Sequence, residues 1–182
     1  TLAVSLLKIA NDVRLLNMGP RCGLGEITVP AVQPGSSIMP GKVNPVIAES
    51  LAQVCAQVIG NDAAISIGGA SGLLDLNVML PVMTHNLLES ERLLSSACTM
   101  FADKCIAGLV ANVERCEQQI EWSMSMVTSL APVIGYETAA RLAKQAVEQG
   151  KTVRQMCHEM QVLPEARIDA LLDARSMLHP SV

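Results

Sequence analysis

The sequence predicts an all-α protein in which helices pack on helices, and three observations support this class. Half of the 182 residues are hydrophobic but only 2% are aromatic, so Leu, Ala, Val and Met must build the core. Apolar residues recur at three- and four-residue steps over long stretches, which is the period of an amphipathic helix. Glycine and proline gather in a few stretches that separate these periodic segments.

The composition also excludes several kinds of protein. The mean hydropathy of +0.36 is high, and either a membrane or a large subunit interface could account for it. No uninterrupted apolar run of about 18 residues is present, and no basic segment precedes an apolar one at the start, so we expect neither a membrane span nor a signal peptide. Burial of apolar surface in an oligomer therefore remains as the explanation for the high hydropathy. The net charge of −4 disfavours a nucleic-acid partner.

The six cysteines are scattered, and no two form a Cys-x-x-Cys pair. Several lie within apolar helical patterns, so we expect buried, reduced thiols of a cytoplasmic protein rather than disulfides or zinc ligands. No cluster of ligands suggests a metal, and no cofactor is expected. The cysteines are Cys22, Cys55, Cys98, Cys105, Cys116 and Cys157.

The first 44 residues predict a helix followed by a long irregular connection. Residues 1–17 are apolar at helical spacing, with no start signal ahead of Thr1, so we expect a fragment that begins inside a helix. Residues 18–44 are predicted as one irregular connection, and connections of that length are uncommon unless they are functional. The helix breakers within it are Gly19, Pro20, Gly23, Gly25, Pro30 and Pro34.

Two long helices are predicted next. The first runs from Pro45 to about Ile67 and is ended by the glycine-rich stretch 68–72. The second spans 76–109, with a kink near its start at Pro81. In it, Leu87, Leu94 and Phe101 recur at heptad spacing, which favours a bundle or a coiled-coil-like core. A small isolated bundle fits the same periodicity.

The last third predicts a separate small helical domain. We expect a boundary near 111–113, which gives parts 1–112 and 113–182. Asn112 is a candidate cap for the first helix and Gly150 a stop for the second, while Thr152 and Pro164 are start signals. The predicted helices span 112–122, 134–149, 151–160 and 164–173.

Residues 35–45 read Gly-Ser-Ser-Ile-Met-Pro-Gly-Lys-Val-Asn-Pro and predict a loop that leads into a helix. Gly35 and Gly41 permit close approaches that a side chain would forbid, and Pro45 suits the first turn of a helix. On composition alone the stretch fits a mobile connection equally well.

The polar residues of this loop favour anion binding. Lys42 would bind a carboxylate, Asn44 can donate a hydrogen bond to one of its oxygens, and the following helix dipole adds positive potential. Ser36 and Ser37 are candidate nucleophiles or bases at the front of the loop. The sequence therefore predicts an anion-binding loop with a reactive hydroxyl.

The order of these residues resembles the signature of the fumarase/aspartase superfamily, Gly-Ser-Ser-x-Met-Pro-x-Lys-x-Asn-Pro. A similarity to class II fumarase extends over nearly the whole chain and begins midway through that family's sequence. It is carried by Asn11-Asp12-Val13-Arg14, Gly19-Pro20-Arg21, Gly23-Leu24-Gly25-Glu26, Val58-Ile59-Gly60-Asn61-Asp62, Leu76-Asn77-Val78 and Ile134-Gly135-Tyr136. The resemblance implies the C-terminal part of a long central helical bundle, followed by a small C-terminal helical domain.

The family that the chain resembles also implies the assembly and the reaction. Its members are homotetramers whose central helices pack together, and each active site draws residues from three subunits. The expected reaction is the reversible hydration of fumarate to (S)-malate, small dicarboxylates. Since the family's other substrate-binding motifs are not in this chain, we expect the 182 residues alone to be inactive.

By the same resemblance, Ser36 is the catalytic base, and Ser37, Lys42 and Asn44 bind substrate. Glu49 pairs with a histidine of another segment and subunit to orient a water; the alternative is a carboxylate that the helix dipole favours. None of the chain's own histidines matches a catalytic position, and a helix-face or surface place is expected for each. They are His85, His158 and His179.

The motifs do not agree fully on the substrate. Gly23-Leu24-Gly25-Glu26, Gln33-Pro34 and residues 68–72 look like fumarase, whereas Asn77-Val78-Met79 and Met177-Leu178-His179-Pro180 look like aspartase. Two single residues depart from the family pattern: Leu15 stands where fumarases often have Trp, and Ala131 where both groups usually have Asn. Fumarase leads. The alternatives are an aspartate ammonia-lyase and a noncatalytic helical assembly module.

Overall fold

The structure, a computed structural model, describes residues 1–178. It is built of helices with two short strands, which confirms the predicted all-α class. The chain divides into two compact units, Thr1–Asn112 and Val113–Val182. Each unit has its own hydrophobic core, as expected of a folding domain.

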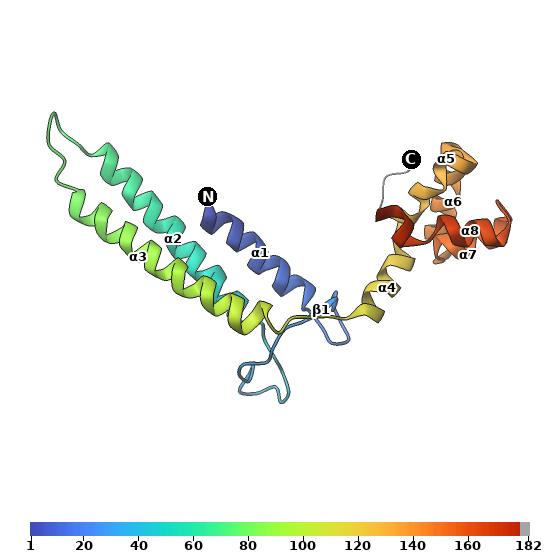
Figure 1. Cartoon of the computed structure of the whole chain (residues 1–182), viewed down its shortest axis with the longest axis horizontal. Helices are drawn as coiled ribbons and strands as arrows, with labels where there is room; N and C mark the ends of the chain where they lie inside the picture. Colours follow the sequence, from blue (N-terminus) through green and yellow to red (C-terminus); the bar gives the residue numbers. More distant parts are fainter. Residues whose placement is uncertain (179–182) are drawn as a thin grey trace. The chain divides into compact units, whose positions relative to one another are not determined.

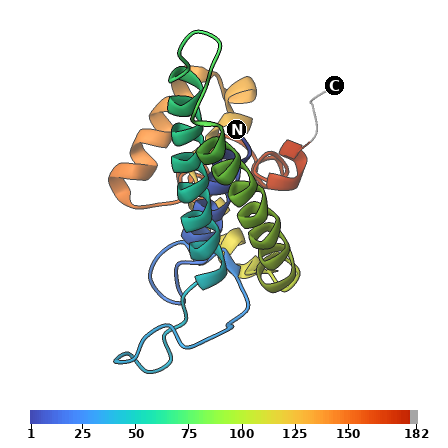
Figure 2. The same ribbon diagram turned by 90° about the vertical axis from the view of Figure 1, so that its left-hand side faces the viewer.

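The first unit contains three α-helices: α1 (Leu2–Leu16), α2 (Val46–Ala70) and α3 (Leu80–Phe101). Helices α2 and α3 run side by side in opposite directions, and α1 lies along α2 (Figures 1 and 2). The core lies where all three helices meet, at the beginning of α2 and the end of α3. Its buried members are Ala3, Ala10, Val13, Val29, Ala48, Leu51, Cys55, Ala97, Phe101 and Cys105.

The sequence predicted the connection 18–44 to be irregular throughout, but the structure contains a short strand there. Its strand β1 (Ile27–Thr28) pairs antiparallel with β2 (Val110–Ala111), so that Ile27 lies opposite Ala111 and Thr28 opposite Val110. A strand of two residues is too short to show a period of two, and its partner lies far along the chain. The prediction was therefore wrong at these positions.

Helix α2 also extends beyond its predicted end, through Gly68 and Gly69 to Ala70. A Cβ atom on Gly68 would lie 2.6 Å from the Cγ atom of Met83, so the glycine allows α3 to approach α2 closely. The Nδ2 atom of Asn77 donates to the carbonyl oxygen of Gly68 at 3.0 Å. Gly68 therefore serves helix packing, and the helix ends two residues after it, at Ala70.

Helix α3 is shorter than predicted, because it starts at Leu80 and its α-helical part ends at Phe101. Pro81 lies in the first turn, where its missing N–H costs no hydrogen bond, so it helps to start the helix and does not kink it. A π-helical turn, η1 (Ala102–Ile106), follows and places Cys105 in the core.

A buried polar pair links α2 to α3. The Nδ2 atom of Asn61 donates to the hydroxyl oxygen of Ser90 at 3.0 Å, and its Oδ1 atom accepts from Gln57 at 2.8 Å. The Ser90 hydroxyl in turn donates to the carbonyl oxygen of Asn86. A buried amide that needs a partner across the interface favours one register of the two helices over its neighbours.

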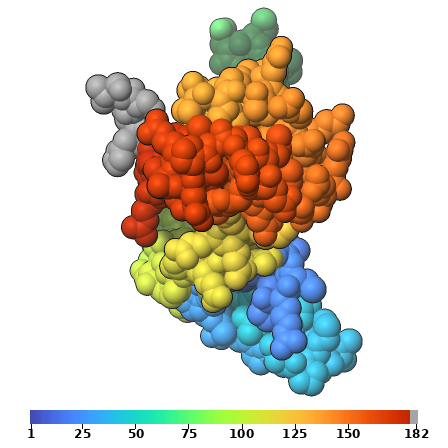
Figure 3. All heavy atoms as spheres, turned by 90° about the vertical axis from the view of Figure 1, so that its right-hand side faces the viewer, coloured from blue at the N-terminus to red at the C-terminus, as the bar shows by residue number. Residues whose placement is uncertain are grey.

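The second unit is a cluster of short helices. They are α4 (Val113–Trp122), η2 (Met124–Ser129), α5 (Ala131–Ile134), α6 (Tyr136–Gln149), α7 (Val153–Met160), α8 (Glu165–Leu171) and η3 (Ala174–Leu178). Figure 3 shows the close packing of the later segments, coloured orange to red. The core includes Leu130, Leu142, Val153, Cys157 and Ile168.

The predicted helix signals of this unit are largely confirmed. Thr152 forms a capping box with Gln155, and Gly150 ends α6 in the left-handed conformation. Helix α6 begins at Tyr136 and not at 134, because Gly135, with φ +83°, separates it from α5. Pro164 precedes α8 directly.

Arg154 joins three helices of the second unit. Its Nε atom lies 3.1 Å from the Oε1 atom of Glu121 on α4, and its Nη1 atom 2.5 Å from the Oδ1 atom of Asp169 on α8. The Nη2 atom also donates to the carbonyl oxygen of Leu172 at 3.1 Å. This planar fork, which holds several acceptors at once, is a property of arginine that lysine lacks.

All six cysteines are free thiols; Cys55, Cys105 and Cys157 are buried, whereas Cys22 is exposed. Burial raises the pKa of the Cys157 thiol to about 11, so the thiol stays protonated near neutral pH. Among the helices of residues 1–178, none is both long and apolar enough to cross a bilayer.

Candidate functional site

The loop 35–45 is closed at its base by hydrogen bonds within the loop. The backbone N–H of Gly35 donates to the carbonyl oxygen of Lys42 at 2.8 Å, and the Nδ2 atom of Asn44 donates to the carbonyl oxygen of Gly35 at 3.1 Å. A Cβ atom on Gly35 would lie 2.8 Å from the Asn44 nitrogen and the Lys42 oxygen. Only glycine fits at this point of closure.

Ser36 follows directly, and its hydroxyl oxygen faces two backbone amides. The Oγ atom accepts from the N–H of Ile38 at 3.2 Å and from that of Met39 at 3.1 Å. Two amide dipoles that point at one oxygen favour negative charge on it. The neighbouring Ser37 is exposed, whereas Ser36 is half-buried.

Lys42, Asn44 and Glu49 lie on either side of the start of α2. Lys42 is exposed, and Asn44 is half-buried. Pro45 is the N-cap and Val46 the first helical residue, one position later than the sequence predicted. Glu49 is half-buried in the first turn of α2, where the helix dipole favours a carboxylate.

Two separate hollows border the loop and the start of α2. Lys42 lines the larger one, of about 770 Å³, together with the loop residues Pro40, Gly41 and Val43 and parts of the segment 17–31. Glu49 lines a smaller one, of about 320 Å³. No residue lines both of these hollows, so Lys42 and Glu49 lie in different ones.

The structure adds residues to which the sequence analysis gave no part in a site. Asn11, Arg14 and Leu15 of α1 line the hollow of Glu49, and the Nη1 atom of Arg14 donates to the Oδ1 atom of Asn11 at 2.9 Å. Asn17 and Asn112 line the hollow of Lys42. Sequence reasoning treated Asn112 only as a candidate helix cap, because its partners lie more than 80 residues away.

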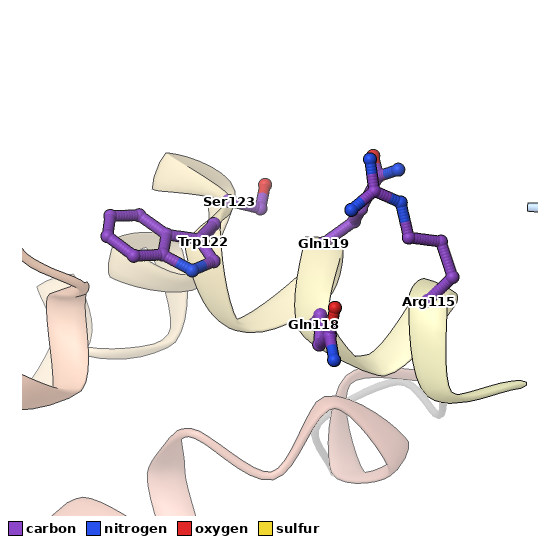
Figure 4. A pocket seen from close by; sticks show the side chains of 5 residues that line it. All are labelled: Arg115, Gln118, Gln119, Trp122 and Ser123. Carbon is purple, nitrogen blue, oxygen red and sulfur yellow. The ribbon is translucent and has the colours of Figure 1, made fainter. Parts of the chain in front are cut away.

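A further hollow of about 510 Å³ lies on α4 of the second unit (Figure 4). The side chains of Arg115 and Gln119 extend to the same side of the helix, and the Trp122 ring lies over its end. Lined by these residues with Gln118 and Ser123, it holds no carboxylate that could act as an acid or base. This hollow shares no lining residue with the two described above.

Neither of the two histidines within residues 1–178 lines either hollow. His85 is exposed on α3 and His158 is exposed in the last turn of α7, while His179 lies outside the described residues. Within residues 1–178, no group of three or more His, Cys, Asp or Glu side chains is arranged as metal ligands would be.

Comparison with known proteins identifies the class of this fold and loop. A family model described as Lyase matches residues 1–60, which include the loop 35–45, and one described as Fumarase C C-terminus matches residues 126–179. The first unit therefore carries a lyase sequence, and the second a domain found at the end of fumarase C. Both matches fall within single units of the fold.

Curated relatives cover most or all of the chain. A class II fumarate hydratase of Mycobacterium tuberculosis is 59% identical over 85% of this chain. Fumarate hydratase 2 of Arabidopsis thaliana is 48% identical over 100% of this chain. An aspartate ammonia-lyase of Pseudomonas aeruginosa is 49% identical over 98% of the chain. The chain spans only 33% to 38% of the length of these relatives.

Solved structures share the fold over almost all residues. A class II fumarase from Schistosoma mansoni has a TM-score of 0.93 at 40% identity, covering 100% of this chain and 38% of its own. A fumarate lyase/delta crystallin from Brucella melitensis, bound to cobalt, has a TM-score of 0.91 at 52% identity, covering 98% of this chain and 39% of its own. The chain belongs to the fumarase/aspartase superfamily of lyases. Its resemblance to class II fumarases, predicted from the motifs, is thereby confirmed.

Proposed function

We propose that the complete protein containing this chain is a class II fumarate hydratase, which adds water reversibly to fumarate to give (S)-malate. This chain would supply the loop 35–45 to an active site shared between subunits. The observation that carries the proposal is the loop itself, in which a hydroxyl oxygen under two amides is followed by a cation and an amide side chain. The fumarate hydratases among the relatives support the choice of reaction.

In the dehydration direction, the difficult step is removal of a proton from a carbon next to a carboxylate. We assign this step to the Oγ atom of Ser36, acting as an alkoxide whose charge the N–H groups of Ile38 and Met39 stabilise. The electron pair of the broken C–H bond moves into the adjacent carboxylate. An aci-carboxylate dianion results, and it must be stabilised before the hydroxyl leaves.

Lys42 and Asn44 would stabilise that dianion. The ammonium group of Lys42 is a point charge suited to a carboxylate, and the amide of Asn44 can donate a hydrogen bond to one of its oxygens. Ser37, exposed beside Ser36, would add a hydroxyl contact to the substrate. Because the charge on this carboxylate grows in the transition state, these contacts accelerate the reaction as well as binding substrate.

The acid would come from the hollow of Glu49. There, the carboxylate would pair with a histidine of another subunit and hold the water that protonates the leaving hydroxyl, so that the carbon–oxygen bond breaks and water departs. In this chain Lys42 and Glu49 line different hollows, and the histidine of another subunit would complete the site beside Glu49. We expect a cytoplasmic homotetramer.

The surface of the first unit supports such an assembly. Helix α2 is apolar on nearly all sides, and only Glu49 and Asp62 carry charge among its 25 residues. A helix of that kind is normally buried, yet large apolar side chains along α2, α3 and their connection are exposed in the single chain. They include Ile59, Ile67, Leu73, Leu74, Leu76, Leu87 and Leu88.

An ammonia-lyase acting on aspartate would use the same loop, and the Pseudomonas aeruginosa relative favours it as the second candidate. Proton NMR of the complete protein with fumarate, in buffer containing ammonium, separates the two. We expect malate as the sole product. Formation of aspartate would instead assign Ser36, Lys42 and Asn44 to an ammonia-lyase reaction. If a well-folded tetramer gave no product, both reactions would be overturned in favour of a noncatalytic assembly or another substrate.

The chain by itself is expected to give no product in the same experiment. The histidine that would pair with Glu49, and the other substrate-binding motifs of the family, are not among its 182 residues. Adding chain that supplies those motifs should restore turnover. Robust turnover by the purified 182 residues alone would contradict a shared active site, whichever product formed.

A further inference from the structure

The hollow of Lys42 has a wall outside the loop that the proposed chemistry does not use. It consists largely of the segment Gly25–Val29, with Gly25, Ile27, Thr28 and Val29 all lining the hollow. The loop 35–45 keeps its shape by bonds within itself, such as that from Gly35 to Lys42. The position of Lys42 relative to this part of the hollow therefore depends on what holds the wall.

Asn112 holds the wall from one side with three hydrogen bonds. Its backbone N–H donates to the carbonyl oxygen of Glu26 at 2.8 Å, and its Nδ2 atom donates to the carbonyl oxygen of Gly25 at 2.8 Å. Its Oδ1 atom accepts from the hydroxyl of Thr28 at 3.0 Å. A single asparagine thus extends the pairing of β1 with β2 by side-chain bonds.

Asn17 holds the same wall from the end of α1. Its Oδ1 atom accepts from the backbone N–H of Val29 at 3.0 Å, and the N–H of Glu26 donates to the carbonyl oxygen of Leu16 at 2.9 Å. Both asparagines line the hollow of Lys42. The wall is thereby fixed to α1 on one side and to the end of the first unit on the other.

A close approach of backbone supports the arrangement. A Cβ atom on Gly108 would lie 2.5 Å from the Cγ atom of Pro30, so only glycine lets the turn before β2 come so near to this segment. Gly108 lies two residues before β2 and four before Asn112, and the close approach brings both within reach of β1. The nearest atoms belong to the ring of Pro30, which cannot rotate away from the backbone as a longer side chain could.

We propose that the side chains of Asn17 and Asn112, which we call the asparagine clamp, are positioning residues for substrate binding at Lys42. The clamp holds Gly25–Val29 as a fixed wall, against which the loop 35–45 brings Lys42 to the substrate carboxylate. The inference rests on the proposed role of Lys42. It assigns both residues an indirect action, through the geometry of the hollow.

The test compares Asn112→Ala and Asn17→Ala in the complete protein with Gln118→Ala, which removes an exposed amide on α4 outside the hollow. We expect a fall in kcat/KM on the order of 10–100-fold for the clamp variants, with a clearly raised KM, since a misplacement of about 1 Å can cost 10²-fold. The control should match the parent. A merely structural role would reduce the fraction of folded enzyme, which lowers kcat and leaves KM unchanged.

Hydrogen exchange tests the clamp without any substrate. Peptides that cover 25–29 should exchange faster in both clamp variants, while those from the middle of α2 stay unchanged. Should the parent protein give no product from fumarate, the proposed function fails, whereas this measurement still decides whether the clamp holds the wall. Unchanged exchange at 25–29 with unchanged KM would overturn the inference.

A double variant tests whether the hydrogen bond between Thr28 and Asn112 carries the effect on KM. Thr28→Val removes the hydroxyl that donates to Asn112 with little change in side-chain volume. Because both substitutions break the same bond, their effects on KM should not multiply in Thr28→Val/Asn112→Ala. Fully multiplicative effects would show that the two residues act independently, against a shared clamp.

Discussion

Replacing Ser36 by alanine in the complete protein should lower kcat by on the order of 10²–10⁴-fold or more, the contribution of a positioned general base. The physical reason lies in the two amides. The N–H groups of Ile38 and Met39 point at the Ser36 oxygen at 3.2 and 3.1 Å, and they stabilise an alkoxide only if that oxygen is present. The proposed tetramer should remain intact, because Ser36 lies in a loop outside the core.

Steady-state kinetics and light scattering of Ser36→Ala provide this measurement, and Ser37→Ala is the matched control. Ser37 is exposed and would only contact substrate, so its loss should affect KM more than kcat. A retained rate in Ser36→Ala would remove Ser36 from the role of base. A larger kcat effect for Ser37→Ala would assign that role to the neighbouring hydroxyl.

The helices were predictable from the sequence wherever a local pattern and a local signal coincide. Thr152 starts α7 through a bond to a residue three positions on, and Gly150 ends α6 through its own backbone conformation. By contrast, Gly68 and Pro81 were misjudged. Each is a helix breaker by type, but the approach of Met83 and the place in the first turn determine what it does here.

The residues of the candidate site were likewise predictable from the sequence only where their contacts are local. The residues of the loop 35–45 were recognisable because they are contiguous, and their internal bonds span only a few positions. The wall formed by Gly25–Val29 was not predictable. Its bonds join Asn112 to Gly25 and Thr28 across more than 80 residues, and neither a period of 3.6 nor one of 2 reports such a contact. The separation of Glu49 from Lys42 likewise needed the folded chain.

Gly35→Ala is expected to have the second large effect, although it only adds a methyl group. Its Cβ atom would lie 2.8 Å from the Asn44 nitrogen and the Lys42 carbonyl oxygen and 2.9 Å from the Asn44 Oδ1 atom. Two of these are backbone atoms that no side-chain rotation can move away. The base of the loop must therefore open, which separates Ser36 from Lys42 and Asn44. We expect kcat/KM to fall by about 10²-fold while the proposed tetramer stays intact.

Gly41→Ala separates this steric effect from a general loss of backbone freedom. Gly41 lies in the same loop at φ +78°, yet nothing is within 4 Å of the place its Cβ atom would take. Alanine there costs about 1–2 kcal/mol of backbone strain but no clash, so the loop can relax without opening at its base. Kinetics and circular dichroism of both variants give the comparison. Equal losses would mean that the loop needs flexibility everywhere; a much larger loss in Gly35→Ala would mean that catalysis needs the loop closed where Gly35 meets Lys42.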